Sequence, residues 1–315
     1  MGNQRQNISK VSFQAKAMYL SLKSFRRFSK KIFTKILFNP ARGTNEISAK
    51  KLNAEISIKE FDIKGFSAIT VFNDASTEKH ILFFHGGGYT VEALKGHRTL
   101  VEKLVQQYHF KVTSLDYPLA PENTAEKTID VAEKAYSFLC SEYRNDSIYL
   151  LGDSAGGGLA LALLQILRDK QEEKMPQKTV LLSPWLDITL SHPEIADFEH
   201  KELILDVDAL RKCGLQYAGS LEPKDPGVSP IYGNHSGLGA IHIWVSDHEI
   251  LCPDCVLLHK KLIAAEGSSS TLTVKHKLVH DWIVMPLPER DVTIMEVAEF
   301  FTQTSTTQRD SSVLI

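Results

Sequence analysis

The sequence predicts an α/β protein whose mostly parallel sheet is covered by helices on both faces. First, apolar strand-like runs alternate with helix-like runs through most of the chain, a rhythm typical of parallel sheets. Second, 315 residues with a hydrophobic fraction of 43% are enough for one large core with an appended segment. Third, one strand-to-helix junction carries the pattern Gly-x-Ser-x-Gly.

The strand-like runs cover residues 66–72, 79–84, 111–116, 147–151, 178–183, 240–246 and 271–276. Helical patterns lie around 92–107, 124–144, 157–171 and 253–266. We expect a basic helical segment over residues 1–45 and a main domain over 46–315. An insertion near 187–222 interrupts the rhythm with polar and charged stretches, and loops of this kind often carry substrate selection.

Ser154 lies in the Gly-x-Ser-x-Gly pattern, between an apolar strand and the apolar run 159–167. Gly152 and Gly156 would allow the strand and the helix to approach closely, so the turn would present the serine hydroxyl as a nucleophile. A phosphate-binding loop is the alternative, but no Lys-Ser/Thr pair follows either glycine run.

A nucleophilic serine needs a base, an orienting acid and donors for the oxyanion. The run His85-Gly-Gly-Gly-Tyr89 follows strand 79–84. We predict an oxyanion hole from the N–H groups of Gly86, Gly87 and Ala155.

The acid and the base follow later strands. Asp247 and Glu249 come just after strand 240–246, and His280 lies in the loop after strand 271–276. The resulting chain order of serine, acid and histidine is the one expected for an α/β-hydrolase. Either carboxylate could hold the imidazole, so position alone leaves the acid open.

Four motifs in order resemble those of the hormone-sensitive-lipase-like carboxylesterases, an α/β-hydrolase group, and the resemblance covers about residues 60–300. They are His85–Tyr89, Asp116–Glu122, Gly152–Gly157 and Ser183–Asp187. The resemblance implies a serine esterase for small to medium acyl esters with Ser154 and His280 in its triad. It favours Glu249 over the rival Asp247, because Glu249 stands where many members have the aspartate of Asp-Pro-Leu. One departure is Pro118, where the family usually has arginine.

Substrate contacts are expected at Gly88 and Tyr89 of the glycine loop and at Asp153, for which a structural hydrogen bond is an equal alternative. The leading hypothesis is therefore a cofactor-free carboxylesterase that uses no metal. Two alternatives stay open: a non-catalytic ligand-binding protein on the same fold, and an amidase or peptidase with the same triad.

The first 45 residues contain ten Lys and Arg residues and no Asp or Glu, although the whole chain has a net charge of −2. Apolar residues have helical spacing between Met18 and Leu37. This segment is expected to form cap helices over the active site, as the resemblance implies. It is also a candidate for peripheral contact with an anionic membrane surface, and the two roles are compatible.

The chain has four cysteines, two of them in the isolated pattern Cys252-Pro-Asp-Cys255. Without a second pair or a suitably spaced histidine, we expect structural thiols and not a zinc or redox site. Few cysteines and no recognisable signal peptide predict a cytoplasmic protein, with the inner membrane face as a further location. A small ester is the expected partner, nucleic acid is not expected, and a homodimer stays open.

Overall fold

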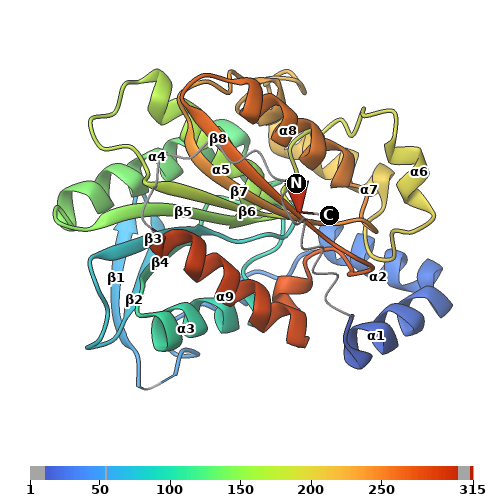
Figure 1. Ribbon diagram of the computed structural model, residues 1–315, viewed down its shortest axis with the longest axis horizontal. Coiled ribbons are helices and arrows are strands. Elements are labelled where there is room, and N and C mark those ends of the chain that lie inside the picture. Colours follow the sequence, from blue (N-terminus) through green and yellow to red (C-terminus); the bar gives the residue numbers. More distant parts are fainter. Residues whose placement is uncertain (1–10, 54, 304–312, 315) are drawn as a thin grey trace, which may run out of the picture.

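The computed structural model describes residues 11–53, 55–303 and 313–314, and a nine-stranded sheet forms its centre (Figure 1). The strand order is β1-β2-β4-β3-β5-β6-β7-β8-β9. All neighbours from β4 to β9 are parallel, whereas β1 and β2 are antiparallel to their neighbours. The predicted α/β architecture with a mostly parallel sheet is confirmed.

The strands are β1 (Ser57–Ile63), β2 (Phe66–Phe72), β3 (Lys79–Phe84), β4 (Lys111–Leu115), β5 (Ser147–Asp153), β6 (Lys178–Leu182), β7 (Gly239–Ser246), β8 (Ser268–Lys275) and β9 (Val313–Leu314). The seven predicted strands are all present, with ends that shift by up to three residues. The edge strand β1 was not predicted, because its mixed polar sequence lacks the apolar run of a central strand.

The helices are α1 (Phe13–Ser24), α2 (Arg26–Phe38), α3 (Lys95–Tyr108), α4 (Ala125–Glu142), α5 (Ala155–Asp169), α6 (Ile195–Glu199), α7 (Val207–Ala218), α8 (Cys252–Ala264) and α9 (Pro288–Thr302). Short 3₁₀ turns lie at Pro230–Tyr232 and Trp282–Val284. Helices α4, α5 and α8 cover one face of the sheet, and α3 and α9 cover the other (Figure 1). Each face has its own buried apolar cluster.

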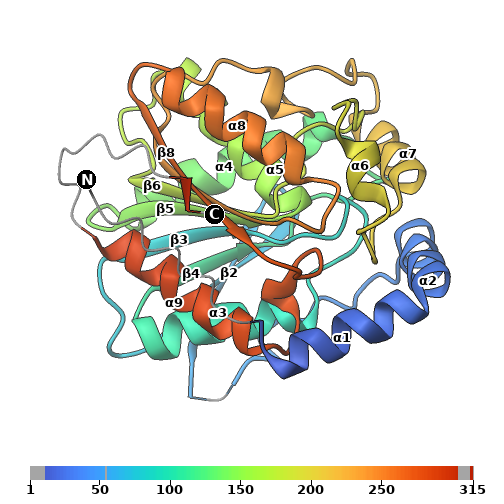
Figure 2. The same cartoon turned by 45° about the vertical axis from the view of Figure 1, so that its right-hand side comes forward.

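The described part of the basic N-terminal segment forms two helices, α1 and α2. The break is at Phe25, whose φ of −113° and ψ of 24° are not helical. Helices α1, α2, α6 and α7 gather at one end of the molecule in both ribbon views (Figure 2), and α2 contacts α7. None of the described helices combines the length and the hydrophobicity needed to cross a bilayer.

Candidate active site

Ser154 occupies a strained turn between the end of β5 and the start of α5. Its φ of 48° and ψ of −117° are unusual for a residue with a side chain. The neighbouring glycines make the turn feasible: a Cβ on Gly152 would collide with the carbonyl oxygen of Gly156, and one on Gly156 would collide with that of Phe84. The chain therefore builds the sharp junction that the pentapeptide predicted.

Three side chains from distant parts of the sequence form one hydrogen-bonded line. Nε2 of His280 lies 3.0 Å from Oγ of Ser154, and Nδ1 of His280 lies 2.5 Å from Oε2 of Glu249. The other carboxylate oxygen of Glu249 accepts hydrogen bonds from the Ser183 hydroxyl at 2.8 Å and the Ser246 N–H at 2.6 Å. Because the carboxylate accepts a hydrogen bond from Nδ1–H, Nε2 of the neutral imidazole is left to accept one from the serine hydroxyl.

Asp247 is directed away from this line. One of its oxygens lies 2.6 Å from Nδ1 of His248, and the other lies 2.6 Å from Nδ1 of His276. It also accepts the N–H of Lys277 at 2.8 Å. Although burial opposes it, hydrogen bonding from these partners lowers the pKa of Asp247 below its usual range. The structure thus brings Glu249, and not Asp247, to His280.

The glycine loop requires a correction to the predicted oxyanion hole. The N–H of Gly86 donates to Oδ2 of Asp153 at 2.9 Å, so this donor is engaged inside the protein. Within the described part of the chain, the N–H groups of Gly87, Gly88 and Ala155 have no such acceptor. The φ angles of Gly87 and Gly88 are 127° and 61°, in the region that favours glycine. The free donors are therefore displaced by one residue along the loop.

Of the two roles left open for Asp153, the contacts favour the structural one over substrate binding, because its side chain is fully buried. Besides the Gly86 N–H, its Oδ2 faces Nε2 of His97 at 3.0 Å. Nδ1 of His97 accepts the N–H of Leu94 at 2.8 Å, so Nε2 carries the proton that is donated to Asp153. His97 was missed as a site residue, since no local motif marks it.

Tyr89 is the second corrected residue. Its side chain is only 1% exposed and stacks on Tyr217 of α7, with ring centroids 3.6 Å apart. The ring therefore joins the glycine loop to the insertion and is not available for substrate. Gly88 is buried beneath α2, because a Cβ on it would lie 2.9 Å from Cδ2 of Leu37, so only its backbone is available at the site.

Asp281 is a second residue that sequence reasoning missed. Its Oδ2 lies 3.2 Å from Nε2 of His280, and its Oδ1 is buried without a hydrogen-bond partner in the described residues. Burial raises the pKa of Asp281 to about 6, although the charge of His280 acts in the opposite direction. Its position directly after His280 was the only signal in the sequence.

The N-terminal helices and the insertion are tied together near the acid. Nε of Arg26 donates to the carbonyl of Glu202 at 2.9 Å, and the Ser29 hydroxyl donates to the carbonyl of Leu203 at 2.7 Å. The buried carboxylate of Glu202 in turn accepts the N–H of Ile250, next to Glu249, at 3.2 Å. A continuous set of hydrogen bonds thus connects α2 with the segment that holds the acid.

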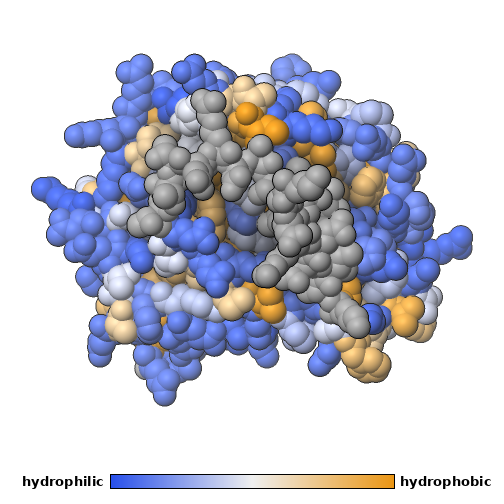
Figure 3. All heavy atoms as spheres, in the orientation of Figure 1, coloured by the Kyte–Doolittle hydropathy of each residue, from blue (hydrophilic) through white to orange (hydrophobic). Residues whose placement is uncertain are grey.

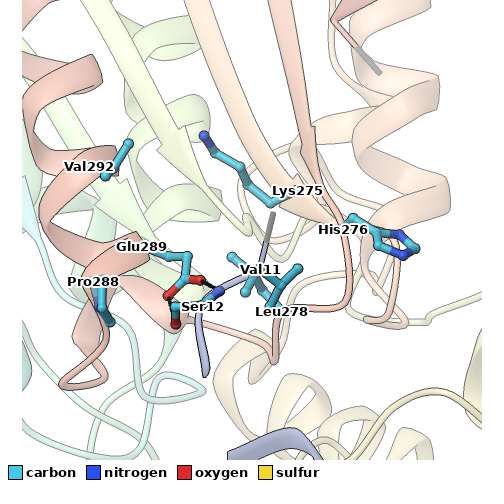
Figure 4. A pocket seen from close by; sticks show the side chains of 8 residues that line it. All are labelled: Val11, Ser12, Lys275, His276, Leu278, Pro288, Glu289 and Val292. Carbon is cyan, nitrogen blue, oxygen red and sulfur yellow. Dashed lines mark hydrogen bonds between the residues drawn. The ribbon is translucent and has the colours of Figure 1, made fainter. Parts of the chain in front are cut away.

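A cleft of about 170 Å³ lies between Val11 and Ser12, the end of β8 and the start of α9 (Figure 4). It is lined by Val11, Ser12, Lys275, His276, Leu278, Pro288, Glu289 and Val292. Glu289 closes part of it by accepting the N–H and the hydroxyl of Ser12 at 2.6 and 3.0 Å. None of the three residues in the hydrogen-bonded line contributes to this lining.

All four cysteines are free thiols, and Cys252 and Cys255 are buried at the start of α8. Burial raises the pKa of Cys252 to about 12, which keeps the thiol protonated and unreactive. Within the described ranges, no group of His, Cys, Asp and Glu side chains has the arrangement of a metal site.

The strained turn at Ser154 and the hydrogen-bonded line of Ser154, His280 and Glu249 identify the protein as an α/β hydrolase with a serine nucleophile. Residues 81–284 match the model of a family described as having the alpha/beta hydrolase fold. This range covers more than half of the chain, which therefore belongs to that family.

The relatives refine this membership. An esterase of Acinetobacter venetianus is 29% identical over 258 residues, which cover 79% of this chain and 83% of the relative. An acetyl-hydrolase of Streptomyces hygroscopicus is 32% identical, covering 72% and 76%. The crystal structure of an esterase from the bacterial hormone-sensitive lipase family superposes with a TM-score of 0.78 at 25% identity, covering 92% of this chain and 98% of that one. The chain is a hormone-sensitive-lipase-like member of the family, as the four motifs predicted.

Proposed function

We propose that this protein is a serine carboxylesterase that hydrolyses short- to medium-chain acyl esters through an acyl-enzyme. The observation that carries the proposal is the line from Ser154 through His280 to Glu249, with contacts of 3.0 and 2.5 Å. Among the relatives, the names esterase, acetyl-hydrolase and ethyl acetate hydrolase point to carboxylic esters of small acids. A related crystal was soaked with p-nitrophenyl butyrate, an ester of the same class.

In the first half of the reaction, Oγ of Ser154 attacks the ester carbonyl carbon while Nε2 of His280 takes the hydroxyl proton. Glu249 holds the imidazole by its Nδ1–H and stabilises the imidazolium that forms. The proton on Nε2 then passes to the leaving alkoxide, and the alcohol departs. Water repeats the sequence on the acyl-enzyme: His280 takes its proton, and the serine oxygen recovers one as the acid leaves.

We assign the oxyanion hole to the N–H groups of Gly87, Gly88 and Ala155. Ala155 is the first residue of α5, so its N–H has no acceptor within the helix and lies at the positive end of the helix dipole. The Gly86 N–H acts differently, because its bond to Asp153 fixes the start of the loop beside Ser154. Preorganised donors of this kind stabilise the charge that develops on the carbonyl oxygen.

The substitution Ser154→Ala tests the proposal. We expect turnover of p-nitrophenyl butyrate to fall by at least about a thousandfold, with an unchanged circular dichroism spectrum. A fluorophosphonate probe should label the wild-type protein at Ser154 and leave the variant unlabelled. Undiminished turnover by the variant would overturn the assignment. A folded wild-type protein that reacts with neither reagent would favour the ligand-binding alternative, and faster cleavage of anilides than of esters would favour the amidase.

For residues 1–45 and the insertion near 187–222, we propose a joint cap over the site. Support comes from the contact of α2 with α7 and from the packing of Leu37 on Gly88. A cap in this position would limit the length of the acyl or alcohol group. Deleting residues 1–40 should therefore change the preference of the protein across a series of esters from acetate to laurate.

The same N-terminal helices support a proposal of peripheral membrane contact on the cytoplasmic side. On α2, Phe28, Ile32 and Ile36 are 64%, 44% and 45% exposed and form one stripe at intervals of four residues. A parallel stripe of exposed cations, Arg27, Lys31 and Lys35, lies one residue before it. Hydrophobic side chains also gather at the lower right of Figure 3, in the region of α1 and α2. Helix α1 contains Phe13 and Leu20, which are 83% and 62% exposed. Apolar and basic stripes side by side suit an anionic lipid surface.

Co-sedimentation with vesicles tests this contact. The wild-type protein should bind vesicles containing phosphatidylglycerol more strongly than vesicles of phosphatidylcholine alone. The triple variant Arg27→Glu, Lys31→Glu, Lys35→Glu should lose that preference, whereas the control Lys50→Glu, Lys134→Glu, Lys260→Glu, which changes exposed lysines elsewhere, should keep it. Equal behaviour of the two variants would contradict the proposal. A homodimer is a separate proposal, and analytical ultracentrifugation of the purified protein tests it.

A further inference from the structure

Asp281 contacts the proposed general base at the ring nitrogen that faces the serine. Its backbone has a left-handed conformation, with φ 53° and ψ 42°, and its Oδ2 lies 3.2 Å from Nε2 of His280. The same nitrogen faces Oγ of Ser154 at 3.0 Å. Nε2 therefore has two oxygen neighbours, one a hydroxyl that must give up its proton and the other a carboxylate that attracts one.

We propose that Asp281 sets the pH range of the reaction as a positioning residue, because its ionised carboxylate holds a proton on Nε2 of His280 until the pH is high enough to release it. This inference rests on the proposed esterase mechanism and adds a group that this mechanism does not use. Because Oδ2 of Asp281 is only 3.2 Å from Nε2, the negative carboxylate interacts unfavourably with the electron-rich Nε2 of a neutral imidazole and favourably with an imidazolium.

The charges around His280 support this assignment. Glu249 faces Nδ1 and Asp281 faces Nε2. Glu202 from the insertion is also near: burial raises the pKa of its carboxyl, and the charge of His280 opposes that rise. Asp153 is close to Asp281 but is engaged by Gly86 and His97. Burial alone would lower the pKa of His280, but the charges of Asp281 and Glu249 outweigh it and raise that pKa well above its usual value.

For the reaction, Asp281 shifts the balance between the protonated and the unprotonated forms of Nε2 of His280. While the proton stays on Nε2, His280 cannot accept the hydroxyl proton of Ser154, and the site is inactive. Once solvent has removed it, Ser154 can attack, and the imidazolium formed in that step is again stabilised by Asp281 until the proton passes to the leaving oxygen. Asp281 therefore reduces activity at low pH and stabilises the charged intermediate at high pH.

The variant Asp281→Asn removes the charge and keeps a side chain that tolerates a left-handed backbone. The acid limb of the kcat/KM profile for p-nitrophenyl butyrate should move down by about 1 to 3 pH units, the usual effect of one neighbouring charge. The variant Asp281→Gly also suits this backbone and should show the same shift. The matched control is Asp247→Asn, which removes a carboxylate of the adjoining loop that does not touch His280, and its acid limb should stay in place.

A second measurement does not depend on ester hydrolysis. The imidazole resonances of His280 are titrated by NMR in the Ser154→Ala protein, with and without Asp281→Asn. A lower His280 pKa in the double variant supports the inference even if no ester proves to be a substrate. Acid limbs and His280 titrations that coincide with and without the Asp281 carboxylate would overturn it, whatever the fate of the proposed activity.

Discussion

The imidazole of His280 meets the carboxylate of Glu249 at 2.5 Å, while the carboxylate of Asp247, two residues earlier, faces His248 and His276. Position in the sequence could not decide between the two acids, but the directions in which their side chains point do. Glu249 lies at the turn where β7 leads into α8, and the Ser246 N–H and the Ser183 hydroxyl hold its second oxygen. Its orientation is therefore fixed before substrate binds.

This difference predicts opposite outcomes for two similar substitutions. Glu249→Gln should lower kcat for p-nitrophenyl butyrate by about a thousandfold or more, because an amide cannot hold the required tautomer and charge. Asp247→Asn should change kcat by less than about tenfold, since it removes contacts only with His248, His276 and the Lys277 N–H. The measurement is steady-state kinetics at the plateau of the pH profile. If Asp247→Asn gave the larger loss, the acid assigned here would be wrong.

Much of this architecture could be predicted from the sequence, because central strands are apolar throughout and the serine turn has a local signature. The predictions that were wrong or missing concern contacts between residues far apart in the sequence, which no local sequence pattern indicates. Gly86 is ordinary in sequence, and only its approach to Asp153 shows that its N–H is occupied. His97 likewise acquires its role from a residue 56 positions away. Helix α9 was not predicted although Ile294, Val297 and Phe301 are buried, because its apolar residues are spread around the helix and form no clear stripe.

Asp153→Asn should loosen the glycine loop. The buried carboxylate oxygen accepts from both the Gly86 N–H and Nε2–H of His97, and an amide oxygen with a neighbouring NH₂ group replaces it poorly. We expect the free energy of unfolding to fall by about 1 to 3 kcal/mol, the usual cost of an unsatisfied buried polar group. Urea unfolding measures this loss. We also expect a fall in kcat, because the displaced loop misplaces the oxyanion donors.

A double variant with His97→Gln provides the control for this interpretation. Because the two residues share one network, the loss in the double variant should be smaller than the sum of the single losses. Strictly additive losses would show that Asp153 and His97 act independently, against the contact described here.

Leu37→Ala should reveal how α2 acts on the site. Leu37 is buried against the glycine loop, and its Cδ2 would touch a Cβ placed on Gly88. Removing a buried leucine side chain typically costs about 2 to 5 kcal/mol, although a helix at the periphery of the fold can detach without global unfolding. We therefore expect KM for long-chain esters to change, while the midpoint of urea unfolding stays close to that of the wild-type protein.

The exposed neighbour Ile36→Ala is the matched control for that variant. Ile36 lies on the same helix and the substitution removes a side chain of similar size, but 45% of Ile36 is exposed, whereas Leu37 is buried. Its KM values across the ester series should equal those of the wild-type protein. A change in KM shared by both variants would indicate a general effect on α2 instead of the specific contact with Gly88.

Stability should decline as the pH falls from about 6.5 toward 4, and His85 contributes to this decline. The ring is fully buried, its Nδ1–H donates to the carbonyl of Gly86 at 2.8 Å, and burial lowers its pKa to about 4. The unfolded chain has an ordinary histidine pKa near 6.5, so in this interval it binds more protons than the folded protein does. The stabilisation that comes from neutral His85 is therefore complete above about pH 6.5 and is lost on acidification. One such residue accounts for at most about 3 kcal/mol by pH 4. Urea unfolding at pH 7.5 and 5.0 measures the loss in the free energy of unfolding, which should be smaller in His85→Gln than in the wild-type protein. The loss that remains in the variant is expected from His235 and His242, whose pKa values burial also lowers to about 4 and about 3. An equal loss in the two proteins would mean that His85 does not titrate differently in the folded and unfolded states.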